Sequence, residues 1–213
     1  METTVDLSPT SYALLGQLAL RPWSVYEMTR NVGRTLHWFW PRAESVLYAE
    51  VKRIADLGLA RAKEEPGDRG RPRTVYSITS SGRRALRAWL ATDPGGVVMH
   101  SEPLLRVHLA PYGTTDDLNA ALAATRSGAE VLLRQALVIA DEFVTGEHQF
   151  QEQVHVRTLL FDYLWNLGLV MYLWADRSAA ELARWPDIAG DDAARRRAVE
   201  HLRTLVAGSP LDS

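Results

Sequence analysis

The sequence predicts a mainly α-helical fold in two parts, of which the first also holds a short β-hairpin. Residues 42–57 place apolar side chains at steps of three and four positions, which is typical of an amphipathic helix. Two short segments rich in strand formers follow, 59–63 and 74–79, on either side of a loop containing Pro and Gly. Beyond residue 102 almost every segment has a helical pattern, so the second part is predicted to be all-α.

Two helices are predicted before residue 42. Residues 9–20 carry a run of leucines that fits a first core helix. Ser24 can cap a second helix, which is predicted to stop near Gly33. The third helix is expected to begin around Pro41, which suits a first helical position, and to end before Gly58.

The third helix has two different faces. Its apolar stripe consists of Ala43, Leu47, Val51, Ile54 and Leu57. Its outer face offers two cations, a hydroxyl, a phenol and a small residue, namely Arg42, Ser45, Tyr48, Ala49 and Lys52. Short polar groups reach base edges and cations pair with phosphates, so this face is suited to a DNA major groove. An ordinary solvated face has a similar composition, and the helix alone does not decide between the two.

The predicted hairpin loop, 64–73, places Arg69, Arg71 and Arg73 close together at a tip. Arginines at such a tip can enter a minor groove or bind phosphates. A solubilising loop is the alternative, because the same segment holds three acidic residues. Thr79 is predicted to cap a further helix over 80–91. Three helices, a hairpin and a helix make a winged helix-turn-helix.

Residues 8–91 resemble the PadR family of bacterial transcriptional regulators. The resemblance rests on seven short matches in order: Leu14-Leu-Gly-Gln-Leu18, Tyr26-Glu-Met28, Ser45-Val-Leu-Tyr48, Leu57-Gly-Leu59, Gly70-Arg-Pro-Arg-Thr-Val-Tyr76, Thr79-Ser-Ser-Gly82 and Trp89. Two features depart from the family pattern. Val25 stands where many members have Gly, and the aromatic run 38–40 replaces a more polar connection. These aromatics are expected to pack in the core or to reach toward an effector pocket.

The chain is predicted to have three parts. Residues 1–91 form a winged helix-turn-helix DNA-binding domain and residues 92–101 a linker. Residues 102–213 form a helical dimerisation and possible effector-binding domain. The resemblance implies a sequence-specific regulator that binds a double-stranded DNA operator, as a dimeric repressor relieved by a small-molecule effector. No cofactor is expected. The sequence has no glycine-rich phosphate loop, no nucleophile elbow and no cysteine, so an enzyme is not predicted.

Charge is distributed unevenly along the chain. Residues 1–91 hold 14 Lys and Arg against 9 Asp and Glu, a balance of +5, whereas residues 92–213 hold 10 against 17, a balance of −7. Together these give the −2 of the whole chain. A basic part joined to an acidic part is expected to present one end to phosphates. The lack of cysteine, of a signal peptide and of a long apolar run favours a cytoplasmic protein without a membrane partner, and the resemblance implies a bacterial one.

The second part is predicted to contain helices over 102–110, from Thr114 or Thr115 to about 146, and over 149–175, 178–185 and 191–207. Within residues 159–174 only Asp162 and Asn166 form a polar strip. A helix that is apolar almost all round must be buried on nearly every side. A small domain rarely supplies that much cover, so a homodimer is predicted, which also matches a two-fold operator.

The same helix suggests a ligand site. The aromatic side chains Phe161, Trp165, Tyr172 and Trp174 could line a cavity for a planar aromatic effector. Packing in the core of a dimer is the alternative.

Two further functions were weighed. His148, Glu152 and His155 have the spacing of one helix face, which would suit a metal-responsive regulator. No fourth ligand accompanies them, so no metal site is assigned. A winged-helix protein-interaction module that does not bind DNA is the other alternative, and DNA binding itself distinguishes it.

Overall fold

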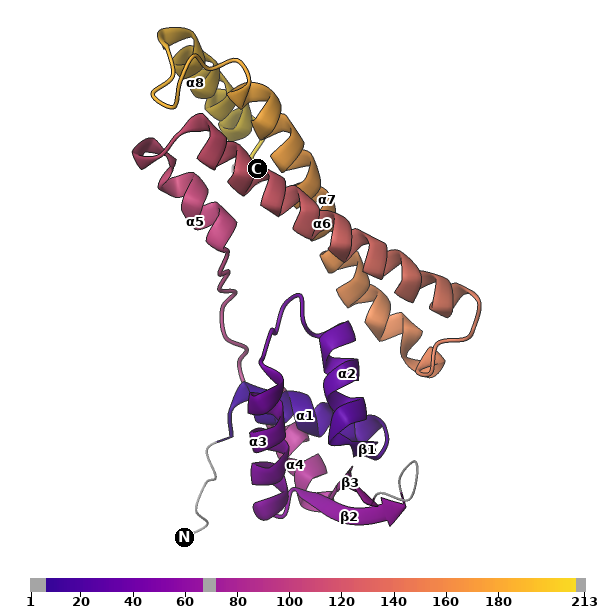
Figure 1. Cartoon of the computed structure of the whole chain (residues 1–213). Helices are drawn as coiled ribbons and strands as arrows, with labels where there is room; N and C mark the ends of the chain where they lie inside the picture. The colour runs from indigo at the N-terminus through magenta and orange to yellow at the C-terminus, as the bar shows by residue number, and fades with distance from the viewer. Residues whose placement is uncertain (1–6, 67–71, 210–213) are drawn as a thin grey trace. The chain divides into compact units, whose positions relative to one another are not determined.

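The computed structural model describes residues 7–66 and 72–209 (Figure 1). They fall into two compact units, Met1–Val97 and Val98–Ser213, and the predicted linker spans the division. The first unit contains α1 Pro9–Leu20, β1 Trp23–Ser24, α2 Val25–Thr35, α3 Glu44–Asp56, β2 Ala60–Pro66, β3 Pro72–Ile78 and α4 Ser80–Leu90. The second contains α5 Glu102–His108, η2 Ala110–Tyr112, α6 Thr115–Val144, η3 Gln151–Gln153, α7 Val154–Leu182 and α8 Asp192–Ala207. A mainly helical chain with one winged helix-turn-helix is confirmed.

The core of the first unit is built by α1, α2 and α3 together with the small sheet. Its most deeply buried large side chains are Leu14, Leu15, Trp23, Met28 and Ile54, none of which is more than 2% exposed. The Trp23 indole N–H, buried with them, donates to the carbonyl of Gln17 over 2.8 Å, so the one polar atom of this ring is satisfied. Apolar periodicity in α1 and α3 therefore identified the centre of the core, whereas Ala43 and Leu57 at the two ends of α3 are exposed.

Helix bounds differ from the prediction at two places in this unit. α2 continues past Gly33 to Thr35, since an isolated glycine lowers helix propensity without ending a helix. α3 begins at Glu44 with Ala43 as its N-cap, so Pro41 and Arg42 lie before the helix and not in its first turn. Its end was placed correctly, because Leu57 is the C-cap and Gly58, with φ of 71°, follows in the left-handed region that suits glycine.

The sheet has the order β1-β3-β2, and both pairings are antiparallel. β2 and β3 stay paired from Ala60↔Ile78 to Pro66↔Pro72, so the ladder extends further than predicted into the segment 64–73. β1 was not predicted, because two residues carry no periodicity and the strand exists only through its pairing with β3.

The second unit is dominated by α6 and α7, which run side by side in opposite directions (Figure 1). α7 is one continuous helix, so the predicted break between 175 and 178 is wrong. Ser178 suits an N-cap, but no Gly or Pro interrupts the chain there and the next residues, Ala179 to Leu182, are strong helix formers. α7 also begins at Val154, after a 3₁₀ turn, and not at 149.

The start of α6 and the end of α7 meet in an apolar cluster of the second unit. Leu118, Leu122 and Leu182 form its centre, and Trp174 and Trp185 pack against it. α8 is capped by Asp191 and is joined to α7 by the ion pair between Arg197 and Glu181. Among the helices described, none combines the length and the apolar character needed to cross a bilayer.

Candidate nucleic-acid interface

α3 separates its core face from its outer face as the sequence predicts. Leu47, Val51 and Ile54 are 3%, 1% and 0% exposed and fix one side of the helix against the rest of the unit. Leu57, by contrast, is 39% exposed at the helix end and does not belong to the buried stripe. Ala43, the N-cap, is exposed as well, so three of the five predicted residues form the buried stripe. The opposite side is left for contacts outside the chain.

The outer side of α3 presents the predicted contact residues together. Ser45, Tyr48, Ala49 and Lys52 are all exposed and lie within two turns. They provide a hydroxyl, a phenol, a small apolar contact and a cation. This is the mixture with which a helix can read base edges and hold a phosphate at once.

Arg42 differs from the other four. It precedes α3, its Nε donates to Thr10 Oγ1 over 3.3 Å and a terminal nitrogen donates to the carbonyl of Pro41 over 2.7 Å. Its guanidinium also lies 4.4 Å from the centre of the Trp40 ring. Arg42 is thus tied to its own unit, and Trp40, whose indole N–H donates to the same Thr10 hydroxyl, packs there as well.

The hairpin carries the second predicted set of contacts. Arg69 and Arg71 lie outside the described residues. Arg73 stands on β3 opposite Glu65, is about half exposed, and lies 3.8 Å from a carboxylate oxygen of Glu27. Its charge is therefore partly offset by a carboxylate from α2.

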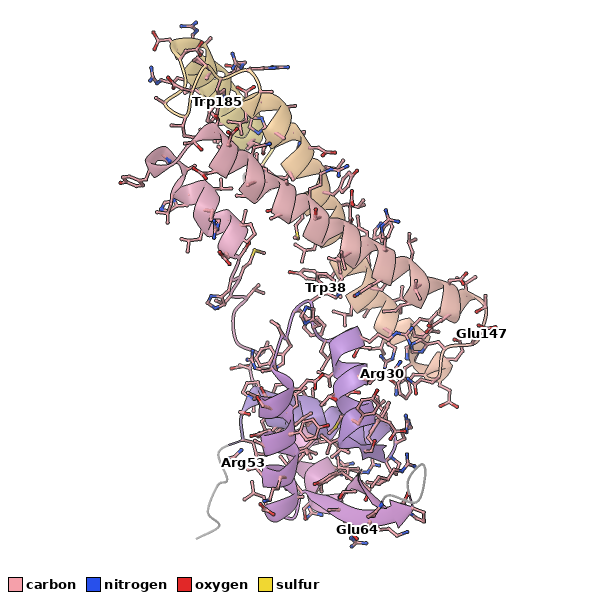
Figure 2. All side chains as sticks on the ribbon, in the orientation of Figure 1. Arg30, Trp38, Arg53, Glu64, Glu147 and Trp185 are labelled. Atoms are coloured by element: carbon pink, nitrogen blue, oxygen red, sulfur yellow. The ribbon has the colours of Figure 1, made fainter. Side chains whose placement is uncertain are left out.

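Two cations on the hairpin were missed in the sequence. Arg61 and Lys63 are exposed on β2, the strand on which Figure 2 labels Glu64. They are two residues apart and so point to the same face of a strand. This spacing of two cations within a segment rich in strand formers is the signal in the sequence that could have predicted them.

Glu27 connects α2 to the hairpin. The backbone N–H of Ser24 donates to its carboxylate over 2.9 Å and the Ser24 hydroxyl over 2.8 Å, which completes a capping box. These two hydrogen bonds hold the pKa of Glu27 below its ordinary value of 4.5, and the charges of Arg21 and Arg73 act in the same direction. Glu27 is therefore ionised at neutral pH, at which DNA binding would be measured.

In the second unit the four predicted effector residues do not gather at one place. Phe161 and Trp165 stack with ring centres 6.1 Å apart. The hydroxyl of Tyr172 accepts from Arg126 over 2.5 Å. Trp174 packs on the leucine cluster formed by the start of α6 and the end of α7. Phe161 and Trp174 are thirteen residues apart on one continuous helix, or about 20 Å along its axis. One small planar molecule does not span that distance within a subunit.

The alternative metal site at His148, Glu152 and His155 loses its geometric basis. His148 lies in the α6–α7 turn beside Glu147, which Figure 2 labels, whereas Glu152 is in a 3₁₀ turn and His155 is in α7. The His148 ring is buried, stacks on Phe143 with centres 3.8 Å apart and accepts the Phe150 N–H at Nδ1. The three residues do not share a helix face, and no group of three or more metal-ligating side chains occurs among the residues that the structure describes.

Comparison with known proteins gives relatives for both the hairpin-containing unit and the overall fold. Residues 14–88 match the family described as Transcriptional regulator PadR-like family. Over 79 residues, 37% of the chain, the sequence is 30% identical to the Negative transcriptional regulator PadR of Bacillus subtilis (strain 168). That match spans 43% of the length of the curated relative.

Solved structures extend the likeness in fold beyond the matched domain. A crystal structure of Bacillus subtilis PadR in complex with operator DNA is 18% identical, covers 81% of this chain and 98% of its own, and has a TM-score of 0.66. A crystal structure of the same protein with p-coumaric acid is 19% identical, covers 82% and 98%, and has a TM-score of 0.59. At these identities the likeness shows a shared fold, including the long helices that follow the winged domain.

Proposed function

We propose that this chain, whose residues 14–88 match the transcriptional regulator PadR-like family, binds an operator as a homodimer and represses transcription until a small effector releases it. The observation that carries the proposal is the outer face of α3. Ser45, Tyr48, Ala49 and Lys52 are exposed together on the side opposite the buried stripe. A helix held in this way can enter a major groove with its polar face toward the bases.

Charge supports the same reading. The +5 balance of residues 1–91 contrasts with the −7 of the remainder, so the first unit is attracted to phosphates and the second is repelled. Arg61, Lys63 and Arg73 add cations on the two strands of the hairpin. Binding that depends on such contacts releases counterions and weakens steeply with salt.

Dimerisation is supported by an uncovered apolar strip on α7. Val156, Leu159, Tyr163 and Val170 lie on one side of the helix and are 58%, 74%, 53% and 63% exposed in a single chain. Isolated exposed apolar residues are ordinary, but several aligned on one side of a helix, here with the exposed Asn166 among them, mark an interaction surface. A second copy would cover it and would set the spacing of two α3 helices for a two-fold operator.

An effector would act by binding one arrangement of the dimer better than another, because only differential affinity shifts such an equilibrium. The relative from Bacillus subtilis was solved with p-coumaric acid, a planar aromatic carboxylate, which makes this class the first to test. In this chain we place the candidate contact at Phe161 and Trp165, the two aromatic residues of the four that stack on each other. Tryptophan fluorescence titrated with p-coumaric acid, beside a Trp165→Phe variant, tests this assignment.

The decisive experiment is a gel shift with the DNA upstream of the chain's own gene, repeated across a range of salt concentrations. Specific retardation that weakens as salt rises supports the proposal. No binding at low salt would contradict it and would favour a winged-helix module that recognises another protein.

A further inference from the structure

The first turn of α1 receives a side chain from the middle of α3. The carboxylate of Glu50 accepts a hydrogen bond from the buried Ser11 hydroxyl and another, over 3.3 Å, from the hydroxyl of Ser8. The two serine oxygens are themselves 3.0 Å apart, and Ser8 caps α1 by accepting the Ser11 N–H. Glu50 also accepts from Arg53 over 3.0 Å, and its side chain is only 15% exposed. A charged group on α3 is thus held inside a polar network.

The Glu50 carboxylate lies at the N-terminal end of α1. The first turn of α1 contains no acidic residue of its own, although the N-terminal end of a helix carries positive partial charge. Glu50 provides the negative charge from α3. The contact is therefore directional and electrostatically favourable, whereas the burial of Leu47, Val51 and Ile54 is driven by a non-directional hydrophobic effect.

The same turn of α1 also holds the segment that enters α3. Thr10, only 6% exposed, accepts from the indole N–H of Trp40 and from Nε of Arg42, both over 3.3 Å. Hydroxyls from one helical turn therefore fix α3 at its entry and again at residue 50. Two separated points of attachment define a rotation about the helix axis, which a single point does not.

We propose that Glu50 is the positioning residue of the recognition helix, setting the rotation of α3 so that Ser45, Tyr48 and Ala49 face the bases in one register. The proposal rests on the DNA-binding function proposed above. The outer ends of the side chains lie about 5–6 Å from the helix axis, so a rotation of about 20° moves them by about 2 Å. Hydrogen bonds to base edges tolerate only a few tenths of an ångström, so such a rotation alters which bases are preferred.

The test compares Glu50→Ala with Asp56→Ala, which removes the same charge from the outer side of α3, one turn beyond Lys52, and leaves the polar network intact. Both variants lose one negative charge, so any general gain in phosphate attraction is common to them. Glu50→Ala is expected to lower the ratio of operator to non-specific affinity by about tenfold and to change the base preference, with the salt slope unchanged. Asp56→Ala is expected to keep the wild-type ratio and preference.

Two milder variants guard against loss of folding. Ser11→Ala removes one donor to the carboxylate and is expected to shift base preference in the same direction as Glu50→Ala. Glu50→Gln keeps an acceptor oxygen and is expected to recover most of the wild-type preference. If Glu50→Ala or Ser11→Ala folds and shows the base preference of Asp56→Ala, the positioning role is refuted. A wild-type chain without specific DNA binding would instead refute the proposed function itself.

Discussion

The carbonyl oxygen of Leu59 occupies the space that a side chain at residue 82 would need. A Cβ placed on Gly82 would lie 2.2 Å from this oxygen and 2.9 Å from Cγ1 of Ile78. The oxygen is held there because it accepts both the backbone N–H and the hydroxyl of Thr79, each over 3.0 Å. The start of α4 can therefore approach the end of α3 and the start of β2 only with glycine at position 82.

Gly82→Ala is expected to destabilise the first unit by about 1–3 kcal/mol, because the clash is with backbone and cannot be relieved by a rotamer change. Gly33→Ala is the matched control, since nothing lies within 4 Å of a Cβ there and the residue is inside α2. It is expected to stabilise the same unit by about 0.5–1 kcal/mol. Thermal and urea unfolding measure both changes, and equal stability of the two variants would contradict the close approach.

Local sequence patterns sufficed where the structure depends on neighbours in the chain. The caps Ser24 and Thr79 and the periodicity of α1 and α3 were all readable, because each involves residues a few positions apart. β1 was not readable, since its two residues are strand only through pairing with β3, about fifty residues later. For the same reason the attachment of Arg42 to Thr10, 32 residues away, was not predicted.

Residue type was misleading where the same residues fit two different local structures. Ser178 suggested a helix start, yet within an unbroken run of helix formers it is simply an interior residue of α7. His148, Glu152 and His155 suggested one helix face, but the helix begins only at Val154. In both cases the assumed start of a helix, at 149 and at 178, was wrong.

Lys52→Ala is expected to weaken binding to operator and to unrelated DNA alike, and to reduce the slope of log K against log salt by about 0.9. The lysine is exposed on the outer side of α3, where it can reach a phosphate. Arg196→Ala, an exposed cation on α8, should leave the slope unchanged. Fluorescence anisotropy across salt measures both slopes, and a full wild-type slope for Lys52→Ala would remove this residue from the interface.

Glu27→Gln is expected to alter stability in a pH-dependent way. Glutamine still accepts from Ser24, so the capping box survives while the negative charge is lost. Since the pKa of Glu27 is lowered on folding, its charge stabilises the protein above its ordinary pKa of 4.5 and ceases to do so as pH falls through the lowered value. The carboxylate is partly exposed, so we expect the variant to lose less than about 1 kcal/mol near pH 7.

The measurement for Glu27→Gln is the melting temperature of wild type and variant from pH 7 to pH 3. Their difference should shrink as the pH falls below 4.5 and through the lowered pKa of Glu27, because the wild-type carboxyl then becomes protonated as well. A difference that stays constant over this range would show that the charge contributes nothing. Operator affinity of the variant should rise slightly, since Arg73 loses its neighbouring carboxylate.

Leu159→Asp is expected to convert the proposed dimer into a monomer. Leu159 is 74% exposed on the apolar strip of α7, where a charge would be buried without a partner in the interface. Leu90→Asp is the control, because Leu90 is similarly exposed, at 67%, but belongs to α4 of the first unit. Light scattering at micromolar concentration gives the masses. A monomeric wild type would refute the dimer, and a dimeric Leu159→Asp would move the interface elsewhere.

Arg197→Ala is expected to loosen α8 selectively. The Arg197 guanidinium donates to Glu181 over 2.7, 3.0 and 3.2 Å, and the Trp185 indole N–H donates to the same carboxylate over 3.1 Å. The hydrogen bond from Arg197 is the main cause that lowers the pKa of Glu181, so the carboxylate is charged and the pair is intact at neutral pH. Both partners of this pair are about one third exposed, and Ala194 is the one buried residue of α8.

Such a helix should open readily once its ionic attachment is lost, because little apolar area holds it. Amide hydrogen exchange in 192–207 is therefore expected to accelerate roughly threefold or more in Arg197→Ala, with exchange in the middle of α6 unchanged. Arg195→Ala removes an exposed pair with Asp192 on the same helix and should have little effect. If both variants exchange at the wild-type rate, α8 is held by its few apolar contacts and not by Glu181.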